Sequence, residues 1–294
     1  MLFMNRHELK DLILKKRSFL CVGLDTRPDG IPGFLKEVSE DPVFEFNRRI
    51  IDATIDLAIA YKPNLAFYES AGSKGWLSLE KTIHYLANHP RGPVFTIADA
   101  KRADIGNTAQ QYAGAFFEHM PFDALTVNPY LGRDAVKPFL SYPGKWAIIL
   151  ALTSNPGARD FQMLQPQLPF FLEKFGIKTS YGKKLFELVM EESSRWGTPD
   201  NTMFVVGATH PGFLSSVREI VPDHFLLIPG VGAQGGKLGN IARMVINKDV
   251  GIIVNSSRDI IYASSGKDFD TAAKMAAQAL QQQMAHILKT EINQ

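Results

Sequence analysis

Residues 94–108 read Val-Phe-Thr-Ile-Ala-Asp-Ala-Lys-Arg-Ala-Asp-Ile-Gly-Asn-Thr and predict a strand that ends in a cluster of charges. The apolar run over 94–98 is followed within six residues by four charged side chains, which are Asp99, Lys101, Arg102 and Asp104. If the chain stays extended to residue 101, side chains two apart share a face, so Asp99 and Lys101 point the same way. The stretch therefore predicts an ion pair at the carboxyl end of a strand, the edge at which α/β folds carry their sites.

A helix is expected directly after this cluster. Asn107 and Gln110 have the spacing of a helix N-cap and its N3 partner, which predicts a helix from Asn107 to about residue 119. The simpler interpretation of the whole stretch is a surface salt-bridge cluster on a strand-to-helix connection. The rest of the chain decides between that interpretation and a functional site.

Strand-like and helical patterns alternate along the chain. Short apolar runs, typical of strands buried on both faces, lie at 18–24, 58–63, 94–98, 124–128, 146–152, 203–207, 225–229 and 251–254. Helical patterns follow them at 42–57, 77–88, 107–119, 134–139, 181–196, 213–220, 238–245 and 269–290. Eight such units in 294 residues predict an α/β fold, a (β/α)8 TIM barrel with extra helices.

No linker divides the chain, so we expect a single barrel domain over residues 1–294. A short amphipathic helix at about 6–16 is additional to the basic barrel. The other addition is a lid or insertion region at about 156–196, in which residues 158–180 are irregular. Long loops in compact domains commonly act as lids or binding loops.

The composition excludes several classes of protein. The chain is 45% hydrophobic and 21% charged, and its net charge of +2 with no long basic run gives no sign of nucleic-acid binding. No window approaches the roughly 18 apolar residues of a membrane span, and the N-terminus lacks the apolar core of a signal peptide. The one cysteine, Cys21, lies in an apolar run and is expected to be a small buried hydrophobe. One cysteine forms no internal disulfide, which fits a cytoplasmic protein.

Polar side chains follow the ends of most of the expected strands. They are Asp25, Lys62, Asp99, Lys101, Asp104, Ser154, Gln234 and Arg258. In a barrel the carboxyl ends of all strands meet on one face, where active sites lie. Two lysines and three acids on that face are hard to explain by stability, because burying ion pairs is usually neutral or costly. The set therefore favours an active site over a surface cluster.

The last two strand ends suggest a phosphate site. The glycine-rich stretch Gly230–Gly236 offers backbone N–H groups, Gln234 adds a side-chain donor, and Arg258 can grip phosphate oxygens bidentately. The loops after the seventh and eighth strands are the usual phosphate site of such barrels. Residues 230–235 also match the Gly-x-Gly-x-x-Gly dinucleotide fingerprint, but the next strand ends in Asn255 and not in a ribose-binding acid, so we reject that interpretation.

Metal binding is the alternative use of the acids. Asp25, Asp99 and Asp104 carry the oxygen ligands that Mg²⁺ takes in proteins. The two lysines argue against a metal, because two cations already balance most of the acidic charge. The histidines are scattered without ligand spacing, and among them only His210 follows a strand end closely.

The motifs resemble those of a known family. Asp99-x-Lys101-x-x-Asp104-Ile105-Gly106-Asn107-Thr108, together with Pro229–Gly236, is similar to the signature of the orotidine 5′-phosphate decarboxylases. The central motif alone is shared with metal-dependent relatives, whereas the two motifs together are highly specific. Further positions that match are Asp25, Lys62 and Arg258. The chain length and the stretches 128–132, 153–157 and 255–258 resemble the longer, type 2 subgroup of the family.

The resemblance implies a reaction and a set of roles. The reaction is the conversion of orotidine 5′-phosphate to UMP and CO₂, the last step of de novo pyrimidine (UMP) biosynthesis, without metal or other cofactor. Lys101 is implied as the proton donor to C6, with Lys62, Asp99 and Asp104 completing the charged network. Substrate contacts are implied for Asp25 and Thr108 at the ribose hydroxyls, Ser154 at the pyrimidine, Gln234 and Arg258 at the phosphate, and also for Ile105 and Ser257.

The resemblance also implies a homodimer, in which Asp104 and Ile105 reach the neighbouring subunit's site. It assigns no role to Arg102, Asn128 or Tyr130. We expect Arg102 at the subunit interface and the other two in packing at the rim of the barrel.

Two other hypotheses stay open. The first is a Mg²⁺-dependent relative, such as a phosphosugar aldolase or decarboxylase, which the stretch Pro229–Gly236 disfavours. The second is an inert barrel that binds or regulates a partner. It is disfavoured because such a protein has no need to keep the complete set of charged groups.

Overall fold

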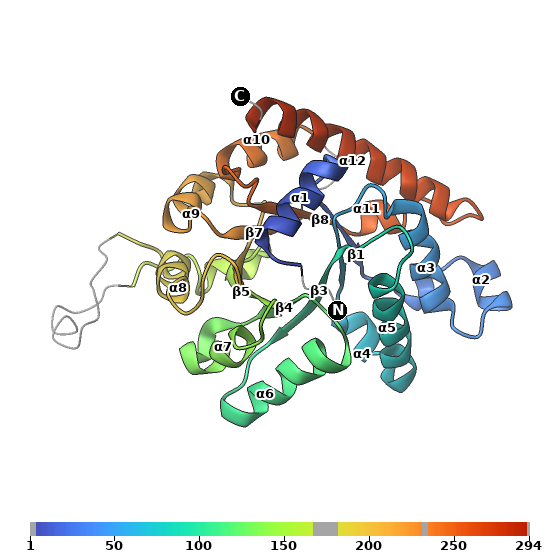
Figure 1. The fold of residues 1–294 in the computed structure, drawn as a ribbon, viewed down its shortest axis with the longest axis horizontal. Coiled ribbons are helices and arrows are strands. Elements are labelled where there is room, and N and C mark those ends of the chain that lie inside the picture. Colours follow the sequence, from blue (N-terminus) through green and yellow to red (C-terminus); the bar gives the residue numbers. More distant parts are fainter. Residues whose placement is uncertain (1–3, 167–181, 231–234, 293–294) are drawn as a thin grey trace.

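The computed structural model describes residues 4–166, 182–230 and 235–292. Within them, eight parallel strands close into a barrel in the order of the sequence, so the predicted (β/α)8 fold is confirmed (Figure 1). The strands are β1 (Leu20–Leu24), β2 (Ala60–Pro63), β3 (Phe95–Arg102), β4 (Ala124–Val127), β5 (Trp146–Leu152), β6 (Thr202–Val206), β7 (Phe225–Pro229) and β8 (Ile252–Ser256).

Helices surround the barrel on its outside (Figure 1). The longer ones are α1 (Arg6–Lys16), α3 (Pro42–Thr54), α5 (Gly72–Ala87), α6 (Gly106–Gly114), α7 (Arg133–Leu140), α8 (Leu185–Ser193), α9 (Leu214–Ile220), α10 (Gly235–Val245) and α12 (Phe269–Glu291). Three short helices were not predicted, namely α2 (Gly33–Val38), α4 (Leu65–Glu69) and α11 (Arg258–Ile261). Helices of one or two turns are too short for apolar periodicity to reveal them.

The expected lid or insertion region at about 156–196 is described only in part. A 3-10 turn, Pro156–Arg159, and helix α8 lie within it. Its central residues, 167–181, lie outside the described residues.

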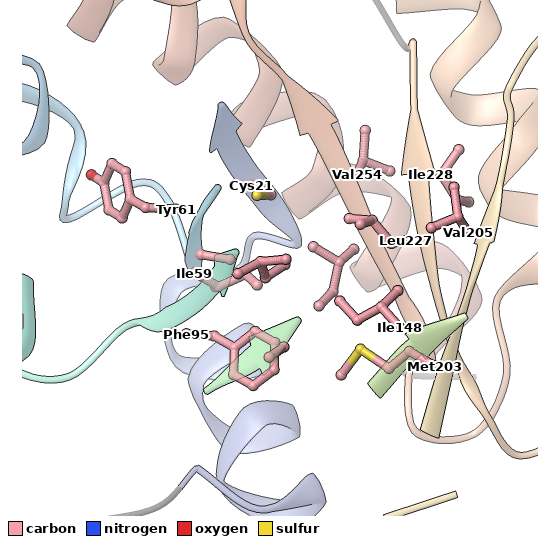
Figure 2. Close-up of a cluster of buried hydrophobic side chains, with 14 of the residues drawn as sticks. Cys21, Ile59, Tyr61, Phe95, Ile148, Met203, Val205, Leu227, Ile228 and Val254 are labelled. Carbon is pink, nitrogen blue, oxygen red and sulfur yellow. The ribbon is translucent and has the colours of Figure 1, made fainter. Parts of the chain in front are cut away.

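Apolar side chains fill the barrel interior. Figure 2 shows a cluster in which Cys21 of β1, Phe95 of β3, Ile148 of β5 and Leu227 of β7 are buried together. Burying a large apolar side chain stabilises a fold by roughly 1.5–3 kcal/mol, so this cluster holds the strands in place. Cys21 is fully buried, which confirms its predicted role as a small core hydrophobe.

The N-terminal segment covers the amino ends of the strands. Trp146, the first residue of β5, donates a hydrogen bond from Nε1 to the Met4 carbonyl at 3.0 Å. Arg6 and Lys10 of α1 form ion pairs with Asp249, just before β8, at 2.8 and 2.7 Å. Because α1 is attached at this end, the carboxyl ends of the strands are left for the functional site.

The start of α6 differs from the prediction. We expected Asn107 as the N-cap with Gln110 at N3, but the helix begins at Gly106, Ile105 occupies the N-cap position, and no side chain caps it. Gly106 has a φ of +54°, which glycine adopts readily. Asp104 Oδ1 accepts the Ile105 N–H at 2.8 Å. The glycine turn and the preceding aspartate therefore place the N-cap two residues earlier than predicted.

A buried hydrogen-bond network joins the end of β1 to α3, α4 and α5. Asn47 on α3 accepts from the Thr26 hydroxyl at 2.6 Å and donates to the hydroxyls of Tyr68 and Thr82 at 3.0 and 3.1 Å. Tyr68 in turn donates to the last carbonyl of β1 at 3.0 Å. All four side chains are at most 1% exposed. Because a buried polar group that loses its partner is costly, the network fixes the loop that carries Asp25.

We predict that Asn47→Ala lowers the free energy of unfolding by about 2–3 kcal/mol, because three buried hydroxyl groups lose a partner together. Urea denaturation measures the change. Asn240→Ala, on the exposed side of α10, is the matched control and is expected to change stability by less than about 0.5 kcal/mol. Equal effects of the two substitutions would contradict a stabilising role for the network.

Candidate active site

Asp99, near the end of β3, lies between two lysines. Its Oδ2 is 2.6 Å from Lys62 Nζ of β2, and its Oδ1 is 2.5 Å from Lys101 Nζ. The side chain of Lys62 is 5% exposed and that of Asp99 is 11% exposed, whereas that of Lys101 is 50% exposed. The expected ion pair is therefore present, Lys62 adds a second and almost fully buried cation, and Lys101 is the more exposed of the two lysines.

The β3 strand is irregular where it carries these groups. In its pairing with β4, residues 99–101 lie opposite Thr126 alone. Lys101 has a φ of +48°, which is uncommon for a residue with a side chain. Thr126 Oγ1 accepts the Lys101 N–H at 2.9 Å and lies 3.2 Å from Asp99 Oδ1. Thr126 was not predicted, because its only signal in the sequence is a hydroxyl near the end of an apolar strand.

Mutual pairing keeps the buried groups charged. Burial by itself would lower the pKa of Lys62, but the negative charges of Asp99 and Asp25 outweigh it, and the pKa is raised. Burial would likewise raise the pKa of Asp99, but Lys62 and Lys101 outweigh it and lower this pKa to about 2. Lys62 and Asp99 are thus both ionised at neutral pH.

Asp25, directly after β1, extends the charged cluster. Its backbone carbonyl accepts from the Tyr262 hydroxyl at 3.2 Å. Its Oδ1 is buried, and among the described residues no hydrogen-bond partner for this oxygen is found. A buried carboxylate oxygen without a donor is costly, so this position favours a donor supplied by a ligand or by water.

Three further predicted residues lie in the connection from β3 to α6 and in the first turn of α6. Asp104 is partly buried and its carboxylate bonds its neighbour's N–H, while Ile105 is 57% exposed and Thr108 is exposed. Within the described part of the chain, no ion pair joins Asp104 to Lys101. One chain therefore brings together Lys62, Asp99, Lys101 and Asp25, but it does not add Asp104.

Ser154 follows β5 and lies against the loops after β6 and β7. Its carbonyl accepts from Thr209 Oγ1 at 3.1 Å. A Cβ on Gly207 would lie 2.7 Å from Ser154 N, so this close approach requires glycine. A Cβ on Gly230 would lie 3.9 Å from Ser154 Cβ, which puts Ser154 beside the start of the glycine-rich loop. Gln234, in that loop, lies outside the described residues.

Ser257 and Arg258 directly follow β8. Asn255 Nδ2 donates to Ser257 Oγ at 3.2 Å, and Ser257 occupies the N-cap position of α11. Arg258, the first residue of α11, is exposed. Gly23 of β1 lies against Ser257, and a Cβ added to Gly23 would lie only 1.8 Å from Ser257 Oγ. The position of Ser257 beside β1 therefore depends on a glycine.

Three residues without an implied role are also located. Arg102 forms an ion pair with Glu69, and its guanidinium lies 5.4 Å from the centre of the Tyr112 ring. Asn128 accepts the Tyr130 N–H at 3.1 Å and so caps a 3-10 turn. Tyr130 is 86% exposed, so the expectation that it packs at the barrel rim is wrong for the single chain.

The described residues contain no group of three or more His, Cys, Asp or Glu side chains arranged to hold a metal ion. Of the helices described, none is both long enough and apolar enough to cross a membrane.

His210 follows β6 and is partly buried, and its Nε2 finds no hydrogen-bond partner within the described ranges.

The arrangement suits chemistry at a centre that becomes negative. Asp99 holds the half-exposed Lys101 ammonium in place before any reaction begins. Preorganised positive charge stabilises a developing anion, and an ammonium group can then act as a general acid. The Lys101 ammonium would stabilise a carbanion formed beside it and could then donate a proton to that carbanion.

Comparisons with known proteins identify similar chains over almost the whole length. The model of the orotidine 5′-phosphate decarboxylase / HUMPS family matches residues 18–275. Orotidine 5′-phosphate decarboxylase of Bacteroides fragilis is 50% identical over 287 residues, which are 97% of this chain and 99% of the relative. That of Flavobacterium johnsoniae is 50% identical over 289 residues, or 98% and 100% of the two chains. The solved structure of Leishmania donovani OMP decarboxylase has a TM-score of 0.76 at 31% identity, covering 96% of this chain and 99% of that one.

We predict that Gly23→Ala lowers the free energy of unfolding by about 1–3 kcal/mol, because the added methyl group forces Ser257 away from β1. Thermal or urea unfolding measures the change. Gly33→Ala, at a helical position where nothing lies within 4 Å of the new methyl group, is the control. It is expected to leave stability unchanged or to raise it by up to about 1 kcal/mol. A Gly23→Ala protein as stable as the control would refute the close packing of β1 against Ser257.

Proposed function

The chain belongs to the orotidine 5′-phosphate decarboxylase / HUMPS family, and from this premise we propose that it converts orotidine 5′-phosphate to UMP and CO₂. This carboxy-lyase reaction is the last step of de novo pyrimidine biosynthesis. The observation that carries the proposal is the Asp99 carboxylate bound between the ammonium groups of Lys62 and Lys101 at the barrel's open end.

Lys101 is the proton donor in this proposal. The bond between C6 and the carboxylate breaks, CO₂ leaves, and the electron pair stays on C6, which has no adjacent electron sink. The Lys101 ammonium supplies positive charge to this carbanion and then transfers a proton to C6, after which the neutral amine regains a proton from water. Its 2.5 Å contact with Asp99 supports the assignment, because little reorganisation is needed at the moment of reaction.

The substrate contacts follow the strand ends. Asp25 and Thr108 bind the ribose hydroxyls, and the unpartnered Oδ1 of Asp25 is suited to accept a hydrogen bond from one of them. Ser154 contacts the pyrimidine. Gln234 and Arg258 grip the phosphate, with Ser257 beside Arg258. Binding energy from the phosphate, remote from the bond that breaks, can be used to stabilise the transition state.

We further propose a cytoplasmic homodimer in which Asp104 and Ile105 of one subunit complete the site of the other. Two observations support this arrangement. Asp104 makes no ion pair with Lys101 of its own chain among the described residues. Apolar side chains are exposed on the loops after β3 and β4, with Ile105 at 57%, Tyr130 at 86% and Leu131 at 48%.

The two alternatives have less support. A Mg²⁺-dependent phosphosugar enzyme needs acids free to bind the metal, but Asp99 already contacts two ammonium groups. An inert binding subunit has no need for a buried, fully charged Lys62–Asp99 pair, which is costly to keep.

We predict that Lys101→Ala lowers kcat/KM for orotidine 5′-phosphate by at least about 10³-fold, because both the preorganised charge and the proton are lost. The loss of orotidylate absorbance in the ultraviolet follows the reaction. Lys137→Ala, which replaces an exposed lysine on α7, is the control, and its kcat/KM should stay within about twofold of the unchanged protein.

The chelator EDTA should leave the decarboxylase activity unchanged. A loss of activity that depends on metal would reject the proposal.

The proposal that each site combines Lys101 of one subunit with Asp104 of the other gives a separate prediction. Lys101→Ala and Asp104→Asn proteins are each expected to be inactive, but mixed dimers contain one intact site. If subunits reassort randomly, half of the dimers are mixed, so activity should recover to about one quarter of the unchanged protein. Mixing Lys101→Ala with Asp99→Asn is the control and should recover nothing, because both residues serve their own subunit. No recovery in the first mixture, with exchange of subunits verified, would contradict the shared site.

A further inference from the structure

We propose that Thr126 is a positioning residue that fixes Lys101 relative to Asp99 through its side-chain hydroxyl. The inference deepens the decarboxylase function proposed above and rests on it. Thr126 lies on β4, next to the segment of β3 that carries both charged residues. It is 1% exposed, so its hydroxyl acts on these neighbours and not on solvent.

The first link is to the backbone of Lys101. Regular pairing between β3 and β4 is interrupted at residues 99–101, so the N–H of Lys101 is not satisfied by the ladder of the sheet. Thr126 Oγ1 accepts this N–H at 2.9 Å. Lys101 also has the left-handed φ of +48°, a conformation that persists only where surrounding contacts hold it. The Thr126 hydroxyl is one such contact.

The second link is to the carboxylate that orients the ammonium group. Thr126 Oγ1 lies 3.2 Å from Asp99 Oδ1 and 3.4 Å from the Ala98 carbonyl, and its one proton can be donated to either acceptor. Asp99 Oδ1 is the nearer of the two, and it is also the oxygen that contacts Lys101 Nζ at 2.5 Å. A single hydroxyl group therefore contacts both the backbone of Lys101 and the partner of its ammonium.

Two substitutions at Thr126 distinguish the effect of its hydroxyl group from the effect of its side-chain shape. Valine keeps the β-branched shape of threonine and suits a strand, but it neither accepts the Lys101 N–H nor donates to Asp99. Serine keeps the hydroxyl and loses only a methyl group. If Thr126 acts by packing alone, valine replaces it well. If it acts through the hydroxyl, serine replaces it better.

The experiment compares Thr126→Val with Thr126→Ser, using steady-state decarboxylation and hydrogen exchange of the Lys101 amide. We expect Thr126→Val to lower kcat by about 10- to 100-fold with KM changed by less than about threefold, because a misplaced catalytic group costs rate more than binding. Thr126→Ser should stay within about threefold of the unchanged protein. The Lys101 amide should exchange at least about tenfold faster in the valine variant than in the serine variant.

Thr202→Val is the matched control. Thr202 on β6 is also fully buried, and within the described part of the chain its hydroxyl donates only to Asn201 Oδ1, at 3.1 Å and outside the site. Its kcat should stay within about twofold of the unchanged protein. If Thr126→Val does not fold, Thr126→Ala against Thr126→Ser makes the same comparison.

Three results would overturn the inference: an unchanged kcat in the variant without the hydroxyl, an equal loss in the serine variant, or equal amide exchange in both. An inactive unchanged protein would instead reject the proposed function, and the amide exchange would still decide whether Thr126 holds Lys101.

Discussion

The ionised carboxylate of Asp99 is the interaction on which the rest of the site depends. Burial alone would raise its pKa, and it is charged because Lys62 and Lys101 approach within 2.6 and 2.5 Å. Lys62 in turn keeps its charge because Asp99 and Asp25 oppose the effect of burial. Removing Lys62 or Asp99 leaves a buried charge without its nearest partner, which costs more than the intact pair contributes to stability. The cluster is therefore explained by the chemistry that it permits.

The barrel supplies what such a cluster needs. Parallel strands bring their carboxyl ends to one face, and the N-terminal segment covers the opposite ends through Met4 and α1. Satisfied buried hydrogen bonds then reduce local freedom around the charges, as Asn47 does for the loop after β1 and Thr126 does for the irregular part of β3. In the proposed mechanism, which uses no metal, rigid support of this kind holds the Lys101 ammonium in place.

The sequence predicted the barrel well because strands buried on both faces are continuous apolar runs. The runs at 146–152 and 225–229 coincide with β5 and β7. Short helices such as α4 and α11 escaped prediction, since one turn carries no periodic signal. The pairing of Asp99 with Lys101 was predicted from regular alternation, yet the strand reaches it through an interrupted register and a left-handed Lys101. That detail, and the contact with Thr126, depend on how β3 pairs with β4, which local sequence patterns do not contain.

The ionisation of Asp99 in the intact protein tests this account most directly. Carbon-13 NMR of labelled aspartate carboxyl groups, with the Asp99 resonance assigned by its loss in Asp99→Asn, can be followed from neutral pH down to the limit of the folded state. The account predicts that this carboxylate stays ionised throughout, because its pKa is lowered to about 2. A titration midpoint at or above the ordinary aspartate value of about 3.9 would contradict it.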